Sequence, residues 1–377
     1  MAKIIVVGLG AMGSAAAQHL AERGHQVIAF DRFTPPHTKG SSHGQTRMIR
    51  QAYWEDRRYV PLVLRAYQLW RKLEKDSGRQ LLHVTGGLVI GRPQGTLVQR
   101  SMESAEAFHL PYRMLTAMET RSRSPAFSVP DDAIALWEEQ AGYLVPEDCV
   151  RAQLERARSA GATLQFDEPV LGWRADGDGV AVRTAGGLYH ADRLVLTAGP
   201  WSAEFLQGVS APLTVTRQIV YWFEPKSPID NFREDKLPVY LMEGQRGERV
   251  LYGFPALGAA NEGVKIALHG SDDVCLPDTV DRCMHPSEET SIRSRMERDL
   301  PSLAGRLVRT ETCLYTMTPD EHFIIDRHPE FVQVTIAGGF SGHGFKFANV
   351  VGEIIADLCI DGSSSFDLGL FALDRFN

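Results

Sequence analysis

The first thirty residues constrain the fold of this chain more than any other stretch. Residues 4–7 are an uninterrupted β-branched run, as expected of a strand that is buried on both faces. A G-x-G-x-x-G pattern follows directly, formed by Gly8, Gly10 and Gly13. The alanine-rich residues 12–23 then predict a helix, which Gly24 ends. Strand, glycine turn and helix in this order predict the start of a βαβ unit.

A second strand, predicted at residues 27–30, ends at Asp31. In a βαβ unit the glycines allow close backbone approach to a pyrophosphate, and the helix N-terminus offers unpaired N–H groups. Asp31 lies 23 residues after Gly8, where an acid can accept hydrogen bonds from a ribose diol. The combination predicts a dinucleotide site and leaves both NAD and FAD open.

A signal far downstream favours FAD. Residues 193–196 predict another buried strand, which runs into Thr197, Ala198 and Gly199. A strand that ends in small residues suits a place where the backbone passes close to a nucleotide. Many flavoproteins spread their nucleotide fold along the chain in this way, whereas NAD enzymes tend to complete it in one contiguous domain.

Composition excludes several classes of protein. The formal net charge of −7 argues against a nucleic-acid surface, and no apolar run approaches the ~20 residues that span a bilayer. The five cysteines are scattered and form no C-x-x-C pair, which argues against a disulfide framework or a metal site. We therefore expect a soluble cytoplasmic protein without a signal peptide, a membrane segment or a nucleic-acid partner.

Length and element pattern predict an α/β fold of two interleaved domains, since a chain of 377 residues is natural for two. Residues 59–78 and 146–160 are predicted helices, and residues 215–312 are rich in predicted strands. We expect a Rossmann-like FAD-binding domain made of residues 1–84, 144–214 and 313–377. A substrate domain with a large mixed or antiparallel sheet is expected from residues 85–143 and 215–312.

Two pairs of basic residues are candidate site residues. Arg47 and Arg50 are three apart, which places them on one face of a predicted helical turn; a solvated basic turn is the alternative. Lys265 and His269 share one face of a predicted strand in EGVKIALHG. Either Lys265 points to water, or it lines a pocket together with His269.

Residues 335–359 repeat the arrangement of a strand, a glycine-rich turn and a helix. The helix N-terminus after Gly342 and Gly344 would stabilise negative charge, such as that of a reduced flavin. Lys346 is expected in the first turn of this helix, where cations are unfavourable. A residue that breaks a local rule is a functional candidate.

Cys313 lies in the segment ETCLYTMTPDEHFIID. By itself it is either a small buried hydrophobic residue or a residue with chemistry. Asp326, at the end of the same segment, is expected to have a structural role.

With these pieces placed, the chain resembles, nearly end to end, the monomeric sarcosine oxidase and N-methyltryptophan oxidase family of FAD-dependent amine oxidases. The segments that carry the resemblance are GLGAMGSAAA, PPHTKGSSHGQTRMIRQAY, YVPLVLRAYQLW, YGFP, TCLYTMTPDEHFIID and GFSGHGFKFA. The family implies covalent FAD and oxidation of the C–N bond of a secondary amino acid, sarcosine or another N-methyl amino acid. It further implies reduction of O2 to hydrogen peroxide and a monomeric protein.

The resemblance also implies roles for single residues. Cys313 matches the cysteine that is joined to the flavin 8α-methyl, and Arg50 and Lys346 match the pair that grips the substrate carboxylate. Lys265 matches the lysine beside the flavin where O2 is reduced. The family's substrate pocket and flavin surroundings match His269, Tyr252, Arg47 and His43. The full set expected to bind the cofactor is Gly8, Gly10, Gly13, Asp31, Arg32, Ser41, His43, Thr46, Arg47, Val170, Ala198, Gly199, Cys313, Gly342, Gly344, Phe345 and Lys346.

The sequence departs from the family pattern near the expected flavin site, at Ser42, Gln45, Gln51 and Trp54. These departures leave the cofactor chemistry intact and put the identity of the substrate in doubt. A related flavin oxidase of pipecolate, proline, glycated or primary amino acids therefore stays open. A flavin-binding protein with a sensing role would bind FAD without releasing peroxide.

Overall fold

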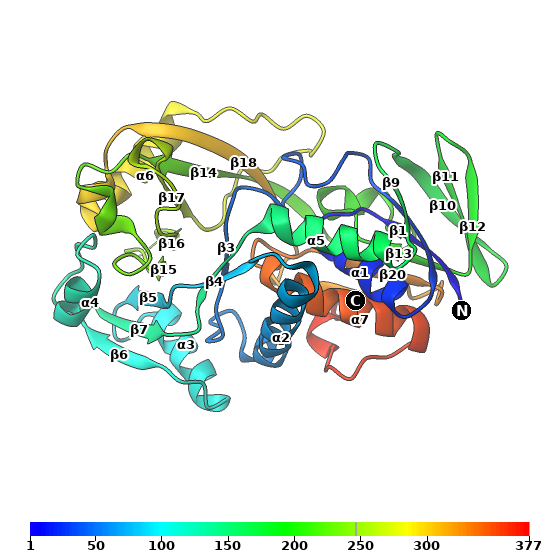
Figure 1. The fold of residues 1–377 in the computed structure, drawn as a ribbon, viewed down its shortest axis with the longest axis horizontal. Helices are drawn as coiled ribbons and strands as arrows, with labels where there is room; N and C mark the ends of the chain where they lie inside the picture. Colours follow the sequence, from blue (N-terminus) through cyan, green and yellow to red (C-terminus); the bar gives the residue numbers. More distant parts are fainter. Residues whose placement is uncertain (246, 377) are drawn as a thin grey trace.

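Two large sheets lie towards opposite ends of the elongated molecule, with helices between and around them (Figure 1). The computed structural model describes residues 1–245 and 247–376, and the elements below are those of these residues. None of the helices in this part of the chain is both long and apolar enough to span a bilayer.

The first sheet is the predicted nucleotide-binding sheet, with strand order β19-β20-β13-β1-β2-β9. Its pairs are parallel except β19 with β20. Its strands are β1 (Lys3–Val7), β2 (Gln26–Phe30), β9 (Thr163–Gln165), β13 (Arg193–Leu196), β19 (Ile324–Arg327) and β20 (Val334–Gly338). Ile4 and Val6 pack into one core and Ile5 and Val7 into another, so β1 is buried on both faces as predicted.

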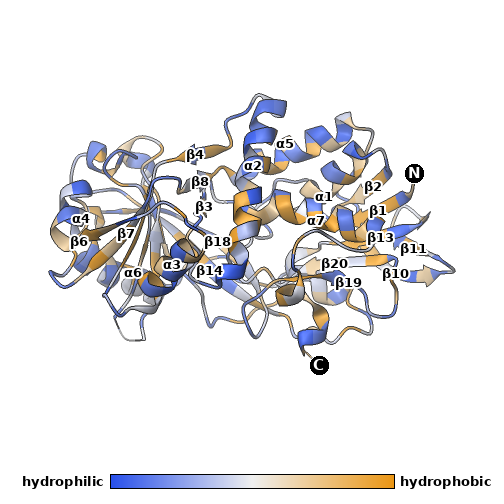
Figure 2. Ribbon diagram, turned by 90° about the horizontal axis from the view of Figure 1, so that it is seen from below, coloured by the Kyte–Doolittle hydropathy of each residue, from blue (hydrophilic) through white to orange (hydrophobic). Residues whose placement is uncertain are grey.

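Helices cover this sheet and pack on one another. They are α1 (Ala11–Glu22), α2 (Val60–Ser77), α5 (Pro146–Ser159) and α7 (Ala348–Asp361). The largely apolar helices α1 and α7 lie side by side (Figure 2), because Gly352 of α7 leaves room for Ala15 of α1. The predicted helices near residues 12–23, 59–78 and 146–160 are thereby confirmed. A three-stranded antiparallel sheet adjoins this end, built from β10 (Val170–Asp176), β11 (Gly179–Thr184) and β12 (Leu188–Ala191).

The second sheet has eight strands, in the order β18-β14-β17-β16-β15-β5-β7-β6. It is mixed: β15 and β5 are parallel and the other pairs are antiparallel. Its strands are β5 (Gly87–Gly91), β6 (Arg113–Thr116), β7 (Ile134–Glu138), β14 (Thr214–Phe223), β15 (Val239–Met242), β16 (Leu251–Gly253), β17 (Val264–Leu268) and β18 (Leu307–Met317). The accompanying helices are α3 (Thr96–Ala107), α4 (Ala117–Arg123) and α6 (Pro286–Asp299). The helix α6 lies in a segment that the sequence marked only as strand-rich.

A small antiparallel sheet connects the two ends and corrects one prediction. It contains β3 (Arg47–Ile49), β4 (Leu82–Val84) and β8 (Gly142–Leu144). Arg47 is therefore in a strand, and the predicted helical turn with Arg50 is wrong. The chain leaves β3 at Arg50, where the Glu138 carboxylate accepts hydrogen bonds from the N–H groups of Gln51 and Ala52. The pairing of β3 with β8 and the hydrogen bonds to the buried Glu138 carboxylate fix the conformation of this segment, so the three-residue spacing of Arg47 and Arg50 does not produce a helical turn.

Candidate active site

One large cavity runs between the two sheets and has about 1990 Å³ of empty space, including its open mouth. Its lining extends from the glycine turn before α1 to Lys346, so the expected nucleotide site and the expected substrate site share this cavity. The expected site residues that line it are Gly8, Gly10, Asp31, Arg32, Ser41, Thr46, Arg47, Arg50, Val170, Ala198, Gly199, Tyr252, His269, Cys313, Gly342, Gly344, Phe345 and Lys346. Gly13, His43 and Lys265 are expected site residues that lie behind this wall.

The glycine turn before α1 forms one end of the cavity. A Cβ on Gly8, whose φ is +88°, would lie 2.5 Å from the Thr197 carbonyl oxygen, and one on Gly13 would lie 1.7 Å from the Gly8 oxygen. Gly13 therefore serves close packing, whereas Gly10 lines the cavity, and a Cβ there would lie 3.5 Å from its nearest neighbour, Ser42 Oγ. Asp31 Oδ2 accepts a hydrogen bond from Leu9 N at 2.7 Å and holds the turn. A bare helix start with an acid beside it fits the diphosphate and ribose of a dinucleotide.

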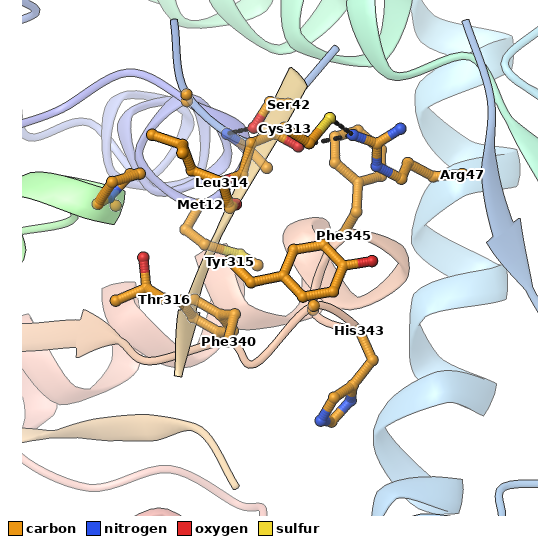
Figure 3. A pocket seen from close by; sticks show the side chains of 18 of the residues that line it. Met12, Ser42, Arg47, Cys313, Leu314, Tyr315, Thr316, Phe340, His343 and Phe345 are labelled. Atoms are coloured by element: carbon orange, nitrogen blue, oxygen red, sulfur yellow. Dashed lines mark hydrogen bonds between the residues drawn. The ribbon is translucent and has the colours of Figure 1, made fainter. Parts of the chain in front are cut away.

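Cys313 lies at the middle of β18, between two cationic side chains. Its Sγ is 3.3 Å from Arg47 Nη2 and 3.5 Å from His43 Nε2. Figure 3 shows Cys313 and Tyr315 on one side of β18, with Leu314 on the other. Burial alone would raise the pKa of the Cys313 thiol, but the charges of His43 and Arg47 more than offset it and lower this pKa to about 6. Cys313 thus presents a thiolate to the cavity at neutral pH.

Two buried cations, Arg50 and Lys346, lie on the cavity wall. Arg50 is 4% exposed and Lys346 is 6% exposed. Arg50 Nη2 donates to Glu55 Oε2 at 2.6 Å, and Lys346 Nζ donates to Tyr53 Oη at 3.2 Å and to the His343 carbonyl oxygen at 2.8 Å. Burial, with the charge of Arg50 added, lowers the pKa of Lys346 to about 7. Arg50 keeps N–H donors beyond those used here, so the pair can still bind an anion.

Lys346 is not in α7 itself. It lies in the short 3₁₀ helix Phe345–Phe347, which immediately precedes α7. Gly342 allows this turn to approach β18, because a Cβ there would lie 2.2 Å from the Tyr315 ring. The turn therefore brings Lys346 to the cavity wall and directs the N-terminal end of the helix towards the cavity.

Aromatic side chains form a further part of the cavity wall. Tyr252 of β16 and Tyr315 of β18 line the cavity together with His269, which follows β17. The His269 ring centre lies 6.4 Å from that of Tyr252 and 5.7 Å from that of Tyr315. Burial lowers the pKa of His269, so the imidazole is neutral at physiological pH. Its neutral ring and the two phenols make a polar wall that carries no charge.

Lys265 is buried, which rules out the alternative that it points to water. Its Nζ donates to the carbonyl oxygens of Gly44 at 2.6 Å and Thr46 at 2.9 Å. Lys265 lines a second cavity and not the main one, and Thr46 lies in the walls of both. Burial, and next the charge of Arg47, hold the pKa of Lys265 well below its ordinary value.

The departures from the family pattern take part in local contacts. Ser42 Oγ accepts from Ala11 N at 3.1 Å, and Gln45 Oε1 accepts from Trp222 Nε1 at 3.1 Å. Trp54 lines the main cavity next to Glu55. Ser42 lines the same cavity, and Trp54 is the bulkier of the two.

Several residues of the site were missed by sequence reasoning. They are Tyr53, Glu55, Glu311, Tyr315 and His343. Alternation along a strand could have revealed Glu311 and Tyr315, because both lie two residues from Cys313 and share its face. No local pattern marks Tyr53 or His343, which are 290 residues apart and meet only in the fold, and the acid Glu55 five residues after Arg50 fits no helical or strand spacing.

Comparisons with known proteins agree with this geometry. Residues 3–358 match the family model described as FAD dependent oxidoreductase. The chain belongs to this family. It is 44% identical to monomeric sarcosine oxidase of Streptomyces avermitilis, over 98% of this chain and 96% of that protein. It is 36% identical to N-methyl-L-tryptophan oxidase of Yersinia pestis, over 99% of both.

Solved structures share the fold of this chain. NikD, described as an unusual amino acid oxidase essential for nikkomycin biosynthesis, superposes with a TM-score of 0.86 at 25% identity, covering 98% of this chain and 97% of that one. L-proline dehydrogenase from P. horikoshii shares the fold with a TM-score of 0.85 at 24% identity, and the match covers 99% of this chain and 97% of that one. The predicted α/β fold and the FAD cofactor are thereby confirmed.

Proposed function

We propose that this chain is a flavin-dependent oxidase of secondary amino acids, sarcosine or other N-methyl amino acids, which oxidises their C–N bond and reduces O2 to hydrogen peroxide. The observation that carries the proposal is the pair of buried cations, Arg50 and Lys346, on the wall that also holds Cys313. A carboxylate bound by this pair would be held in one orientation by charge-assisted hydrogen bonds. The names of the relatives at 44% and 36% identity support the same substrate class.

In this proposal FAD, when bound, would supply the acceptor for the electrons of the C–N bond, and the protein binds and orients the substrate. Arg50 and Lys346 hold the carboxylate, while Glu55 fixes the guanidinium of Arg50. The neutral His269 and the phenol of Tyr252 face the amine. The surrounding cations disfavour a substrate ammonium, so the amine is bound in its neutral, reactive form.

Lys265 is proposed to assist the reduction of O2, in which negative charge develops. A cation in a water-poor site stabilises such charge strongly. Because Lys265 does not line the main cavity and Thr46 lies in the walls of both cavities, Lys265 would act across Thr46 rather than by direct contact. Arg47, which reaches the cavity, adds a second positive charge on the same side.

The proposal also covers the attachment of the cofactor, the domain boundaries, the oligomeric state and the location of the protein. The cofactor is proposed to be covalently bound through Cys313 and held by the residues expected above. The proposed FAD-binding domain is made of residues 1–84, 144–214 and 313–377; its last boundary falls inside β18. A monomer is supported by the names of the relatives, and a cytoplasmic location by the scattered cysteines.

The direct test is peroxide release from the purified holoenzyme over sarcosine, N-methyl-tryptophan, other N-methyl amino acids, pipecolate and proline, with glycine and a glycated amino acid as further arms. We expect the highest kcat/KM for an N-methyl amino acid. Highest turnover of pipecolate, proline, glycine or the glycated amino acid would replace the proposed substrate class by a related one. Bound FAD without peroxide from any of these substrates would contradict the oxidase function.

A further inference from the structure

Glu138 is a buried carboxylate that lies outside the cavity lining and bonds to the chain next to Arg50. It is the last residue of β7, in the eight-stranded sheet, and is 3% exposed. Its Oε1 accepts a hydrogen bond from Gln51 N at 2.6 Å, and its Oε2 accepts one from Ala52 N at 3.0 Å. One carboxylate therefore holds the two peptide N–H groups that directly follow Arg50.

Ala52 connects this carboxylate to the guanidinium of Arg50. Its N–H donates to Glu138, and its carbonyl oxygen accepts from Arg50 Nη1 at 2.5 Å. Arg50 Nη2 is bonded to Glu55 at the same time. We propose that Glu138 is a positioning residue, which fixes the guanidinium of Arg50 for carboxylate binding through the backbone of Ala52. This inference rests on the carboxylate site proposed above.

Tyr53 supports the face of the same guanidinium. The centre of its ring lies 4.4 Å from the guanidinium carbon of Arg50. The N–H of Tyr53 donates to Ser104 Oγ of α3 at 3.1 Å, so this part of the backbone has an anchor of its own. Loss of the bonds to Glu138 would therefore release the carbonyl group of Ala52 and leave the Tyr53 ring in place. The guanidinium would stay near the cavity wall, but its direction within its own plane would no longer be fixed.

A carboxylate suits this position better than an amide. Two neighbouring N–H donors need two acceptors, which the oxygens of a carboxylate provide and a single amide does not. Burial raises the pKa of Glu138 above its ordinary value, although the two N–H groups and the charge of Arg50 oppose this shift. A buried carboxylate is costly without such partners, so the carboxylate and the backbone beside Arg50 hold each other in place.

The role is tested by titration of acetate against the spectrum of bound FAD in the full-length holoenzyme. Glu138→Gln should weaken acetate binding about tenfold, because a small displacement of a binding group weakens an oriented contact. Arg50→Met should weaken acetate binding about 10–100-fold. In the Arg50→Met background, adding Glu138→Gln should change the affinity less than about twofold, since Glu138 acts through Arg50.

Glu74 provides a control with the same kind of bonding. Its Oε1 accepts hydrogen bonds from Leu81 N at 2.8 Å and Leu82 N at 2.9 Å, and Glu74 lies outside the cavity lining. Glu74→Gln should lower the melting temperature and leave the acetate affinity unchanged. Glu139→Gln, at the exposed residue next to Glu138, should change neither. If Glu138 had only a structural role, Glu138→Gln would behave as Glu74→Gln does.

Three results would overturn the proposal. They are an unchanged acetate affinity in Glu138→Gln, additive losses of affinity in the double variant, and an unchanged acetate affinity in Arg50→Met. The test does not depend on turnover of a substrate. If acetate binding follows the expected pattern but no amino acid yields peroxide, the proposed oxidase function fails and the positioning role of Glu138 stands.

A second variant covers the case that Glu138→Gln does not fold. Glu138→Asp keeps the charge and both acceptor oxygens but shortens the side chain by one methylene, so Ala52 must shift to keep its bond. This variant should weaken acetate binding in the wild-type background and change it less than about twofold in the Arg50→Met background. Equal acetate affinity of Glu138→Asp and the wild type would then overturn the proposal.

Discussion

Glu55 and Arg50 form a buried ion pair where the substrate carboxylate is proposed to bind, with 2.6 Å between Oε2 and Nη2. Their side chains are only 11% and 5% exposed. The Arg50 charge outweighs the effect of burial and lowers the pKa of Glu55 to about 2. The guanidinium is therefore positioned before any substrate arrives.

We expect Glu55→Gln to lower the free energy of unfolding by about 3–5 kcal/mol at pH 7, because it leaves the buried Arg50 charge without its partner. Since the pKa of Glu55 is lowered in the folded state, this stabilisation is present above pH ~4.5 and is lost as the pH falls towards about 2. Urea unfolding at several pH values measures the difference in unfolding free energy between the wild type and Glu55→Gln. This difference should shrink below pH ~4.5. Glu155→Gln, at a surface pair with Arg79, should cost less than about 1 kcal/mol. Equal stability of Glu55→Gln and the wild type at pH 7 would refute this expectation.

Affinity for a carboxylate should depend on the protonation of Lys346. Its pKa of about 7 in the free site rises when an anion binds, so affinity is highest below pH 7 and declines above it. Acetate, which has no amine, can be titrated against the spectrum of bound FAD between pH 6 and 9. Lys346→Met should weaken acetate binding about 10–100-fold and remove its dependence on pH. The surface variant Lys72→Met should keep the wild-type affinity and the wild-type pH dependence. A flat wild-type profile would remove Lys346 from the carboxylate site.

Replacement of Lys265 should separate the two half-reactions. Lys265→Met removes the buried amine that is proposed to assist O2 reduction, so we expect flavin reoxidation to slow by about 10²–10³-fold. Anaerobic reduction of the flavin by substrate should change much less. Stopped-flow absorbance measures both rates, with the exposed Lys75→Met as the matched control. Equal effects on the two rates would contradict the assigned role.

Cys313→Ser should abolish covalent attachment while leaving the FAD-binding cavity in place. After acid precipitation, the flavin should remain with the wild-type protein and appear in the supernatant of the variant. Cys275→Ser, at a cysteine outside the cavity lining, should behave as the wild type. Flavin retained by precipitated Cys313→Ser would show that another residue carries the bond.

The elements that could be predicted from sequence are those whose signals are local. The βαβ unit is one, because its strand, glycines and helix lie within thirty residues and each has its own pattern. The buried strand of Lys265 is another, because its alternation is complete without knowledge of a partner. Asp326 was correctly expected to be structural: its carboxylate accepts hydrogen bonds from the N–H groups of Arg327 and Leu373.

The elements that could not be predicted depend on distant partners. Arg47 lies in a strand because β3 pairs with β8, and Ile49 is opposite Gly142. His43 and Glu311 are 268 residues apart in sequence and meet only in the folded chain. The resemblance assigned roles to Arg50 and His43 but gave no information on the carboxylates that pair with them, Glu55 and Glu311.

The position of Cys313 on β18 has a mechanical consequence. This strand pairs along its length with β14 in the eight-stranded sheet, whereas the glycine turn that would hold the nucleotide belongs to the six-stranded sheet. A cofactor bonded to Cys313 would thus act as a cross-link between the two halves of the molecule. The two halves could then move apart only if the adenine end of the cofactor left its binding site. We therefore expect the two halves to unfold in one cooperative transition when flavin is bound, and less cooperatively when it is absent.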